Sequence, residues 1–259
     1  MRTFLLFLAL LLLAGTLGNA RPGDKLIIGM ELAYPPFEMA DPQGNPTGIS
    51  VDLSRALGVA LKRNVEIRNL PFDGLIPSLK TGKIDLIISS MTATPERARA
   101  IDFSEPYLKT GLCLLLAKDS PIQSARDLDS PRQTIAVKQG TTGHLWAVAH
   151  LHSAKILVLD REAACVLEVV QGKAAAFIYD QMSVLKHWQQ NPTTTRPLLT
   201  PLQEESWAIG IRKGDKALTE QINQFLQDYR THGGFDRLGQ QWLGEQRAAF
   251  ESLGVPFVF

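Results

Sequence analysis

Three segments of the chain bring hydroxyls, glycines and single charged side chains together in a way that suits a small charged ligand. The first is Ser89-Ser90-Met91-Thr92-Ala93-Thr94-Pro95-Glu96-Arg97, which follows an apolar run. Its Thr-Pro pair is a favourable helix N-cap and first helical residue, so free backbone N–H groups and hydroxyls gather beside Arg97. Because arginine grips a planar carboxylate with two parallel hydrogen bonds, the segment predicts a carboxylate site. The alternative is a solvated arginine that pairs with a neighbouring acid such as Glu96 or Asp102.

The other two segments follow predicted strands further along the chain. Lys138-Gln139-Gly140-Thr141-Thr142-Gly143 comes after the strand 134–137 and opens a helix, so its backbone amides can receive an anion. Asp180 ends the strand 174–179, where a lone carboxylate can accept hydrogen bonds from an ammonium group. Asp180 also has a second interpretation, as the N-cap of the helix 181–190.

The elements that must position these segments are short apolar strands alternating with amphipathic helices. The run 84–88 is typical of a strand buried on both faces, whereas Leu53, Leu57 and Leu61 recur at helical spacing. The predicted strands are 25–30, 84–88, 134–137, 156–159 and 174–179, and the predicted helices are 51–63, 73–80, 142–152, 161–171, 181–190 and 218–229. This alternation predicts βαβ units and a parallel sheet, in which ligands bind at the carboxyl ends of the strands.

The alternating pattern occurs twice, and apolar runs at 111–117 and 207–212 flank its second occurrence. We therefore predict an α/β fold with two lobes, the second inserted into the first. The predicted boundaries are 21–106 plus 209–259 for the large lobe, 112–203 for the small lobe, and 107–111 and 204–208 for the two hinge crossings.

The composition excludes several classes of protein. The chain has 259 residues, 45% of them hydrophobic, and a formal net charge of +1. It is long enough for a substantial core and lacks the basic surface of a nucleic-acid binder. Cys113 and Cys165 fall in different predicted layers and are expected to be buried free thiols. His144, His150 and His152 lack a zinc-binding spacing, and no nucleophile–base motif is present, so we expect no metal, no cofactor and no enzyme activity.

The first twenty residues predict an export signal. Arg2 precedes an apolar run from Phe4 to Ala14, and small residues stand at Gly18 and Ala20. A positive start, a short apolar region and small residues are the marks of a cleaved signal peptide. We expect residues 1–20 to be removed after Ala20 and the mature protein to be soluble and periplasmic.

The order and spacing of several short motifs carry a family resemblance that spans about residues 25 to 242. The motifs are Tyr34-Pro35-Pro36-Phe37-Glu38, Gly48 with Val51-Asp52-Leu53, Phe72-Asp73-Gly74-Leu75-Ile76-Pro77-Ser78-Leu79, Gly82-Lys83-Ile84-Asp85, Met91-Thr92-Ala93-Thr94-Pro95-Glu96-Arg97, Asp102-Phe103-Ser104-Glu105-Pro106-Tyr107, Val137-Lys138-Gln139-Gly140-Thr141-Thr142, Tyr179-Asp180 and Gly210-Ile211-Arg212-Lys213-Gly214-Asp215. With them the chain resembles the periplasmic solute-binding proteins of polar amino acid ABC transporters, the bacterial extracellular family 3.

The resemblance implies a two-lobed periplasmic binding protein fold of type II that closes around the two charges of an amino acid. Arg97 would clamp the α-carboxylate with the Thr92 and Thr142 amides. Asp180, the Ser90 carbonyl and the Thr92 hydroxyl would hold the α-ammonium. The full set of ligand-binding residues expected is Glu31, Tyr34, Phe72, Ser89, Ser90, Thr92, Arg97, Lys138, Thr141, Thr142 and Asp180. The implied partners are an amino acid ligand and an inner-membrane ABC permease, and the protein is expected to be a monomer that binds no nucleic acid.

Selectivity for the ligand side chain is expected to depend on four of these residues. Tyr34 and Phe72 match positions that sandwich the side chain in the family, although both could be ordinary core aromatics. Glu31 matches an acid that meets the distal group, and Lys138 lies across the cleft. An acid and a lysine suit a side-chain amide, so glutamine-like ligands are placed slightly ahead of arginine-like ones. The alternative is a Glu31–Lys138 salt bridge that only joins the lobes.

Two other functions remain open on the same fold. An exported cyclohexadienyl or arogenate dehydratase would need a general acid in the cleft, for which Glu31 is the candidate. A ligand-sensing module for a membrane receptor would use the same two lobes. The chain departs from the family at Gly48-Ile49-Ser50-Val51-Asp52, which lacks the first acid of the usual motif. Its apolar tail, 245–259, is expected to pack across the large lobe or to contact a partner.

Overall fold

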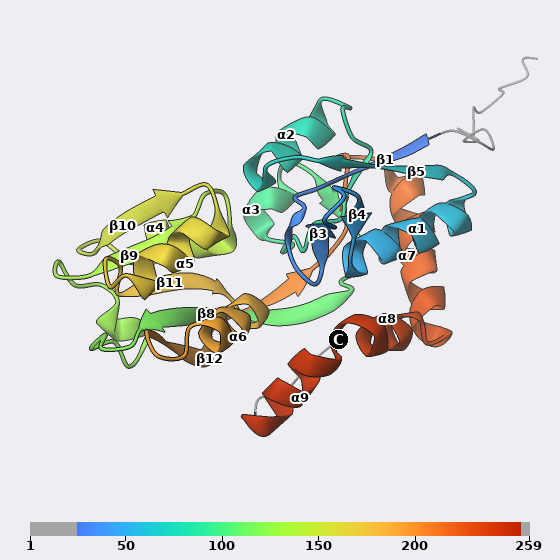
Figure 1. The fold of residues 1–259 in the computed structure, drawn as a ribbon. Helices are drawn as coiled ribbons and strands as arrows, with labels where there is room; N and C mark the ends of the chain where they lie inside the picture. Colours follow the sequence, from blue (N-terminus) through green and yellow to red (C-terminus); the bar gives the residue numbers. More distant parts are fainter. Residues whose placement is uncertain (1–24, 255–259) are drawn as a thin grey trace, which may run out of the picture.

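Apolar strands form two separate five-stranded sheets, one in each of two lobes. The structure, a computed structural model, describes residues 25–254. The strand order is β5-β1-β6-β13-β7 in the first sheet and β10-β9-β11-β8-β12 in the second. Figure 1 shows the two lobes side by side, with helices packed around each sheet. The two α/β lobes predicted from the sequence are confirmed by these sheets.

The large lobe contains the first sheet and a small three-stranded sheet, β2-β3-β4. Strand β1 runs parallel to β5 and β6, and β13 runs antiparallel to β6 and β7. The elements are β1 (Lys25–Met30), β2 (Ala33–Tyr34), β3 (Glu38–Ala40), β4 (Pro46–Thr47), α1 (Ile49–Leu61), β5 (Asn64–Asn69), the 3-10 turn η1 (Phe72–Gly74), α2 (Leu75–Lys80), β6 (Leu86–Ile87), α3 (Pro95–Ala98), β7 (Asp102–Phe103), β13 (Gly210–Ile211), α7 (Lys216–Thr231), α8 (Gly234–Trp242) and α9 (Gly244–Ser252).

The small lobe contains the second sheet, in which β9 runs parallel to β10 and β11. Its elements are β8 (Leu108–Ala117), the 3-10 turn η2 (Ala125–Asp127), β9 (Thr134–Lys138), α4 (Thr142–His150), β10 (Lys155–Leu159), α5 (Glu162–Val170), β11 (Ala176–Asp180), α6 (Gln181–Gln190) and β12 (Thr195–Trp207). Apolar clusters cover both faces of this sheet, because every central strand reads as a nearly continuous apolar run.

Two long strands, β8 and β12, form the connection between the lobes. They pair antiparallel from Leu108 opposite Trp207 to Leu112 opposite Gln203, and the register shifts between Leu198 and Gln203. The proposed hinge crossings at 107–111 and 204–208 fall at this end of the ladder, where the chain passes between the two sheets.

Four details differ from the sequence prediction. The sheets are mixed rather than parallel, because β8 and β13 each enter their sheet from the other lobe and run antiparallel to their neighbours, and β12 leaves the small lobe antiparallel to β8. The expected strand 84–88 is reduced to β6, and the expected helix 73–80 begins with a 3-10 turn. Cys113 and Cys165 are free and buried as predicted, but they lie in one apolar cluster rather than in different layers. Burial raises the pKa of both thiols to about 12.

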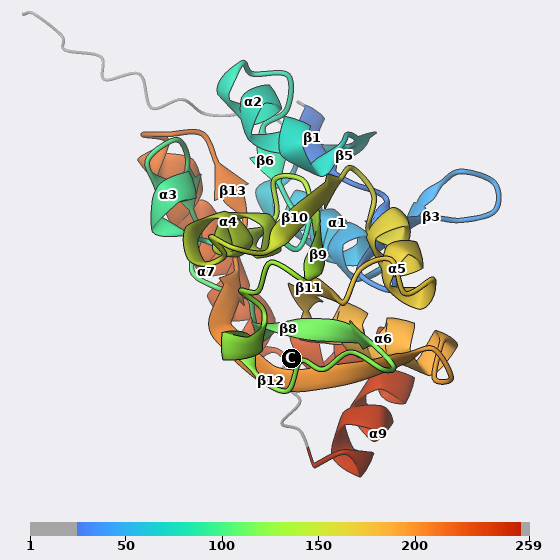
Figure 2. The same ribbon diagram turned by 90° about the vertical axis from the view of Figure 1, so that its left-hand side faces the viewer.

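The carboxyl-terminal helix α9 lies beside the crossing strands. Its residues border grooves together with parts of β8, β12 and α6, and Phe250 is only 1% exposed. Figure 2 shows α9 next to α6 and β12, so this helix, although it follows the large-lobe helices in the chain, lies beside the small lobe and the crossing strands rather than across the large lobe. The predicted signal peptide and residues 255–259 lie outside the described residues. Within residues 25–254, no helix is both long enough and apolar enough to cross a membrane.

Candidate functional site

A cavity lies where the two lobes meet. The space between the atoms is about 430 Å³, including the part open to solvent. The lining residues are Glu31, Tyr34, Glu38, Phe72, Ser89, Ser90, Thr92, Arg97, Thr141, Thr142, Tyr179, Asp180, Glu205 and Trp207. All the predicted ligand-binding residues except Lys138 therefore line one cavity, and their role in binding remains a prediction.

Parallel strands of both sheets position these side chains. Glu31 directly follows β1, and Ser89 comes soon after the neighbouring strand β6. Lys138 and Asp180 end the parallel strands β9 and β11 of the small lobe. The carboxyl ends of both parallel strand sets thus face each other, which is the edge where α/β sheets bind ligands.

Arg97 is buried at the cavity and has no acidic partner. The Thr94 hydroxyl caps α3 by accepting from the Arg97 N–H at 3.2 Å, as the Thr-Pro pair predicts. The guanidinium donates to the Thr92 carbonyl at 2.8 Å and, across the cleft, to the Gly140 carbonyl at 3.0 Å. No carboxylate in the described part of the chain lies within ion-pair distance of it. Burial lowers the pKa of Arg97, and three of its five N–H donors remain for a ligand.

Asp180 is a buried carboxylate that performs two tasks. Its Oδ1 accepts from the Met182 and Ser183 amides at 2.9 and 3.1 Å, so it caps α6 as the alternative interpretation predicted. The same oxygen accepts from the Tyr34 hydroxyl of the large lobe at 2.6 Å. Burial raises the pKa of Asp180 to about 7. Among residues 25–254 it has no cationic partner, so capping leaves its charge available to a ligand.

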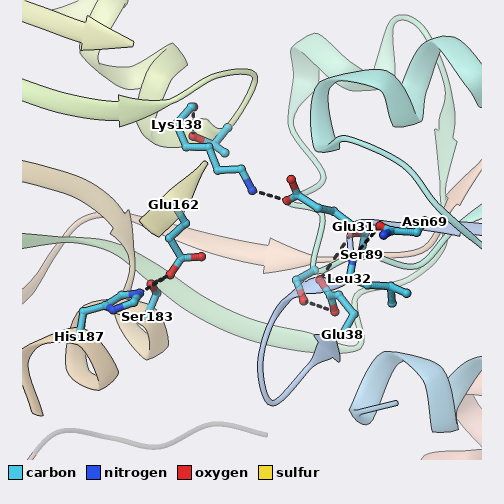
Figure 3. Close-up of polar contacts among 11 residues, drawn as sticks. Glu31, Leu32, Glu38, Asn69, Ser89, Lys138, Glu162, Ser183 and His187 are labelled. Carbon is cyan, nitrogen blue, oxygen red and sulfur yellow. Dashed lines mark hydrogen bonds and ion pairs between the residues drawn. The ribbon is translucent and has the colours of Figure 1, made fainter. Parts of the chain in front are cut away.

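Glu31 and Lys138 form an ion pair across the cleft, as Figure 3 shows. The Lys138 side chain is 4% exposed and does not line the cavity, whereas Glu31 does. The salt bridge that was the alternative interpretation of this pair is therefore present. The Phe72 ring packs against both cations, with its centroid 5.4 Å from the Arg97 guanidinium carbon and 5.6 Å from Lys138 Nζ.

The remaining predicted residues are held by local contacts. Thr141 caps α4 by accepting from the His144 N–H, and its hydroxyl donates to the Lys138 carbonyl at 2.7 Å. Tyr34 stacks on Phe37 with 5.4 Å between ring centroids, so it belongs to the large-lobe core as well as to the cavity wall. Gln139 adds a further contact across the cleft, to Asp73 at 3.1 Å.

Four lining residues were not predicted from the sequence, namely Glu38, Tyr179, Glu205 and Trp207. Glu38 is 1% exposed and accepts from the Ser50 hydroxyl at 2.6 Å and the Ser90 hydroxyl at 3.1 Å. Burial raises its pKa to about 8. Figure 3 shows Glu38 close to Ser89, whose hydroxyl donates to the Glu38 carboxylate. Glu38 therefore contacts the loop that follows β6. A sequence pattern could have grouped Glu205 with Trp207, because residues two apart on a strand point to the same face of the sheet.

No group of three His, Cys, Asp or Glu side chains within residues 25–254 is arranged to hold a metal ion. The groups that meet at the cavity are instead hydroxyls, carboxylates and one guanidinium. This set can recognise a ligand that carries both a carboxylate and a cationic N–H group.

Residues 26–245 match the bacterial extracellular solute-binding proteins, family 3. The chain belongs to this family. The ABC transporter arginine-binding protein 1 of Escherichia coli (strain K12) is 29% identical over 243 residues, which cover 92% of this chain and 98% of that protein. The membership of this chain in the family confirms the resemblance found in its sequence.

Solved structures of amino acid-binding proteins have the same fold. An ancestral arginine-binding protein bound to glutamine has a TM-score of 0.78 and 31% identity, covering 85% of this chain and 98% of its own. The ancestral amino acid-binding protein AncCDT-1, a precursor of cyclohexadienyl dehydratase, has a TM-score of 0.77 and 35% identity, covering 84% and 94%. This family member therefore shares its two-lobed architecture with proteins that bind amino acids.

Proposed function

We propose that this protein is the periplasmic amino acid-binding component of an ABC importer. It closes two lobes around a polar L-amino acid and delivers it, as a monomer, to an inner-membrane permease. The observation that carries the proposal is a buried guanidinium and a buried carboxylate, Arg97 and Asp180, which line one cavity without an ionic partner among the described residues. A buried charge without a partner is costly. A zwitterion supplies the partner for each.

Contacts across the cleft support closure around the ligand. Tyr34 donates to Asp180, Arg97 donates to the Gly140 carbonyl, and Lys138 pairs with Glu31. All three join the large lobe to the small lobe. Since a hinge motion that closes two lobes excludes water from the site between them, charge-assisted hydrogen bonds there are strengthened by the low local dielectric.

The side chain of the ligand is proposed to end in N–H groups. Glutamine was favoured because Lys138 would donate to its amide, but the Lys138 ammonium is engaged by Glu31 and lies off the cavity wall. The Glu31 carboxylate still lines the cavity and can accept from an amide, an ammonium or a guanidinium. Glutamine, arginine and lysine all fit this description. The relatives named for arginine binding and bound to glutamine support the same range.

The dehydratase alternative receives less support from the cavity. Its general acid would have been Glu31, whose carboxylate is held in an ion pair by Lys138. Asp180, which suits an ammonium group, also faces the cavity. We therefore propose binding without chemical conversion.

A thermal-shift screen tests the proposal. Residues 21–259, refolded without carried-over ligand, are heated with each of the twenty L-amino acids, ornithine, citrulline and arogenate. A ligand that binds only the folded protein raises Tm with its concentration, and we expect glutamine or a basic amino acid to do so. If none raises Tm, the amino acid site is contradicted. Turnover of prephenate or arogenate would favour the enzyme instead.

A further inference from the structure

Glu205 is a buried acid on a strand that connects the lobes. It lies in β12 opposite Thr110 of β8, and it is 4% exposed. Its side chain lines the cavity together with Arg97 and Asp180. The next residue towards the small lobe, Glu204, is exposed and does not line this cavity.

The partners of the Glu205 carboxylate are neutral. Oε2 accepts from the Thr92 hydroxyl at 3.2 Å, and Oε1 accepts from the Gln203 side-chain amide at 3.2 Å. No Lys, Arg or His among the described residues lies within ion-pair distance of it. A buried carboxylate whose hydrogen-bond donors are all neutral can be stabilised by a cationic group of a ligand.

The contact with Thr92 decides what that hydroxyl offers to the cavity. A threonine hydroxyl has one proton and two lone pairs. Because the proton is donated to Glu205, the remaining lone pairs can only accept hydrogen bonds. Thr92 also lines the cavity, so its hydroxyl suits an ammonium group rather than a carboxylate.

Glu205 interacts electrostatically with both charged residues of the predicted clamp, Arg97 and Asp180. Burial lowers the pKa of Arg97, and Glu205 is the largest influence that opposes this shift. Glu205 also makes a small contribution to the raised pKa of Asp180, behind burial and other neighbours. Burial is the main cause of the raised pKa of Asp180, and Glu205, which lines the same cavity, adds a smaller repulsion between two acids. An ammonium group between them would relieve that repulsion.

We propose that Glu205 selects ligands that carry an α-ammonium group, by orienting the Thr92 hydroxyl as an acceptor and by placing a second negative charge beside Asp180. This inference rests on the proposed amino acid site and adds to it a residue from the hinge strand. Glu205 is a specificity-determining residue, and it discriminates amino acids from acids that lack the amino group.

The test compares two ligands that differ only in the α-amino group. L-Arginine and L-glutamine are titrated by calorimetry beside 5-guanidinopentanoic acid and glutaramic acid, their counterparts without that group, with competition titrations for weak binding. Glu205→Gln removes the charge and keeps the size of the side chain. Glu204→Gln is the matched control, with the same change one residue away on an exposed position. Thr92→Val and the double variant complete a double-mutant cycle.

We expect Glu205→Gln to weaken binding of the amino acid by about tenfold or more, the effect of losing charge assistance, and to leave the counterpart acid unchanged. Glu204→Gln should change neither. The effects of Thr92→Val and Glu205→Gln should not add, because the two side chains act as one unit. The Tm of ligand-free Glu205→Gln should not fall, since an unpaired buried charge is removed.

Two results would overturn the inference. Equal weakening of the amino acid and its counterpart would show that Glu205 acts on the hinge and not on the ammonium group. Unchanged amino acid affinity would show that it does not act on the ligand. In both cases wild-type binding of an amino acid would leave the proposed function standing, whereas a wild-type protein that binds no amino acid would overturn both proposals.

Discussion

The charged side chains at the two ends of the cavity differ in whether they have an ionic partner. At one end, Arg97 and Asp180 are buried and have no ionic partner in the described chain. At the other end, Glu31 and Lys138 already neutralise each other across the cleft. A buried charge that lacks a partner is stabilised only when a ligand arrives, whereas a paired one is not. Under the proposed function, the contrast predicts that the first end, the clamp, supplies affinity and that the second, the paired end, sets the choice among ligand side chains.

The largest effect is expected from Arg97→Ala. It should weaken binding of the preferred L-amino acid by about 100-fold or more, because two charge-assisted hydrogen bonds of roughly 1.5–3 kcal/mol each are lost. Calorimetric titration measures the change, and an unaltered Tm without ligand shows that the fold persists. Arg97→Lys keeps the charge but not the planar fork, so its affinity should lie between those of the wild-type protein and Arg97→Ala. Wild-type affinity in Arg97→Ala would contradict the prediction that the clamp supplies more affinity than the paired end.

Asp180→Asn should cost about 30-fold in affinity, because the amide lacks the charge that an ammonium group needs. Asparagine is also a good N-cap, so α6 and the contact with Tyr34 should survive and Tm should change little. Asp160→Asn, an exposed position in the same lobe, serves as the control for the loss of one negative charge. A large fall in Tm without any loss of affinity would mean that Asp180 only caps the helix.

The affinity of the wild-type protein should rise with pH through neutrality. Burial raises the pKa of Asp180 to about 7, so the carboxyl is increasingly protonated below that pH. Only the ionised form attracts an ammonium group, so affinity is lost as the pH falls, by about tenfold between pH 8 and pH 6. Titrations across this range in constant ionic strength measure the slope. Asp180→Asn should abolish it, and a slope that persists in this variant would assign the titration to another group such as Glu38.

The smallest effect is expected at the paired end. Glu31→Gln alone leaves Lys138 buried without a partner and should lower Tm, while Glu31→Gln with Lys138→Met should recover it. The double variant should still bind amino acids, with the ratio of its affinities for glutamine and arginine changed by about fivefold. Titration of both ligands measures that ratio. Loss of all binding in the double variant would show that this end also supplies affinity.

Much of the clamp could be predicted from the sequence, because its residues are tied to local helix starts. The Thr94–Pro95 pair, Thr141 and Asp180 are all recognisable N-cap signals, and each one caps the helix that the sequence predicted. A strand that ends just before such a cap places it at the ligand-binding edge of a sheet. Local spacing therefore brought these segments to one edge of each sheet, whereas the roles of Arg97 and Asp180 in holding a zwitterion were implied by the family resemblance and stay predictions.

The rest depends on contacts between distant parts of the chain. Glu31 and Lys138 are 107 residues apart, and Thr92 and Glu205 are 113 apart. Which partner such a side chain chooses is decided by how the lobes close and by the path of the crossing strands, and no local pattern records it. Glu38 was missed for the same reason, because its burial depends on Ser50 and Ser90 from other elements.

The double duty of the capping residues has an evolutionary consequence. Asp180 both holds the start of α6 and faces the cavity, so any substitution there other than by another N-cap residue, such as asparagine, weakens a helix as well as the proposed recognition. Under the proposed function, selection for stability therefore also preserves Asp180 during periods when the ligand is scarce. Glu31 and Phe72 cap no helix. Glu31 is tied to Lys138 instead, so a change there needs a matching change at Lys138. Under the proposed function, a lineage that carries this fold can change its preferred ligand by such paired changes while Asp180 is kept.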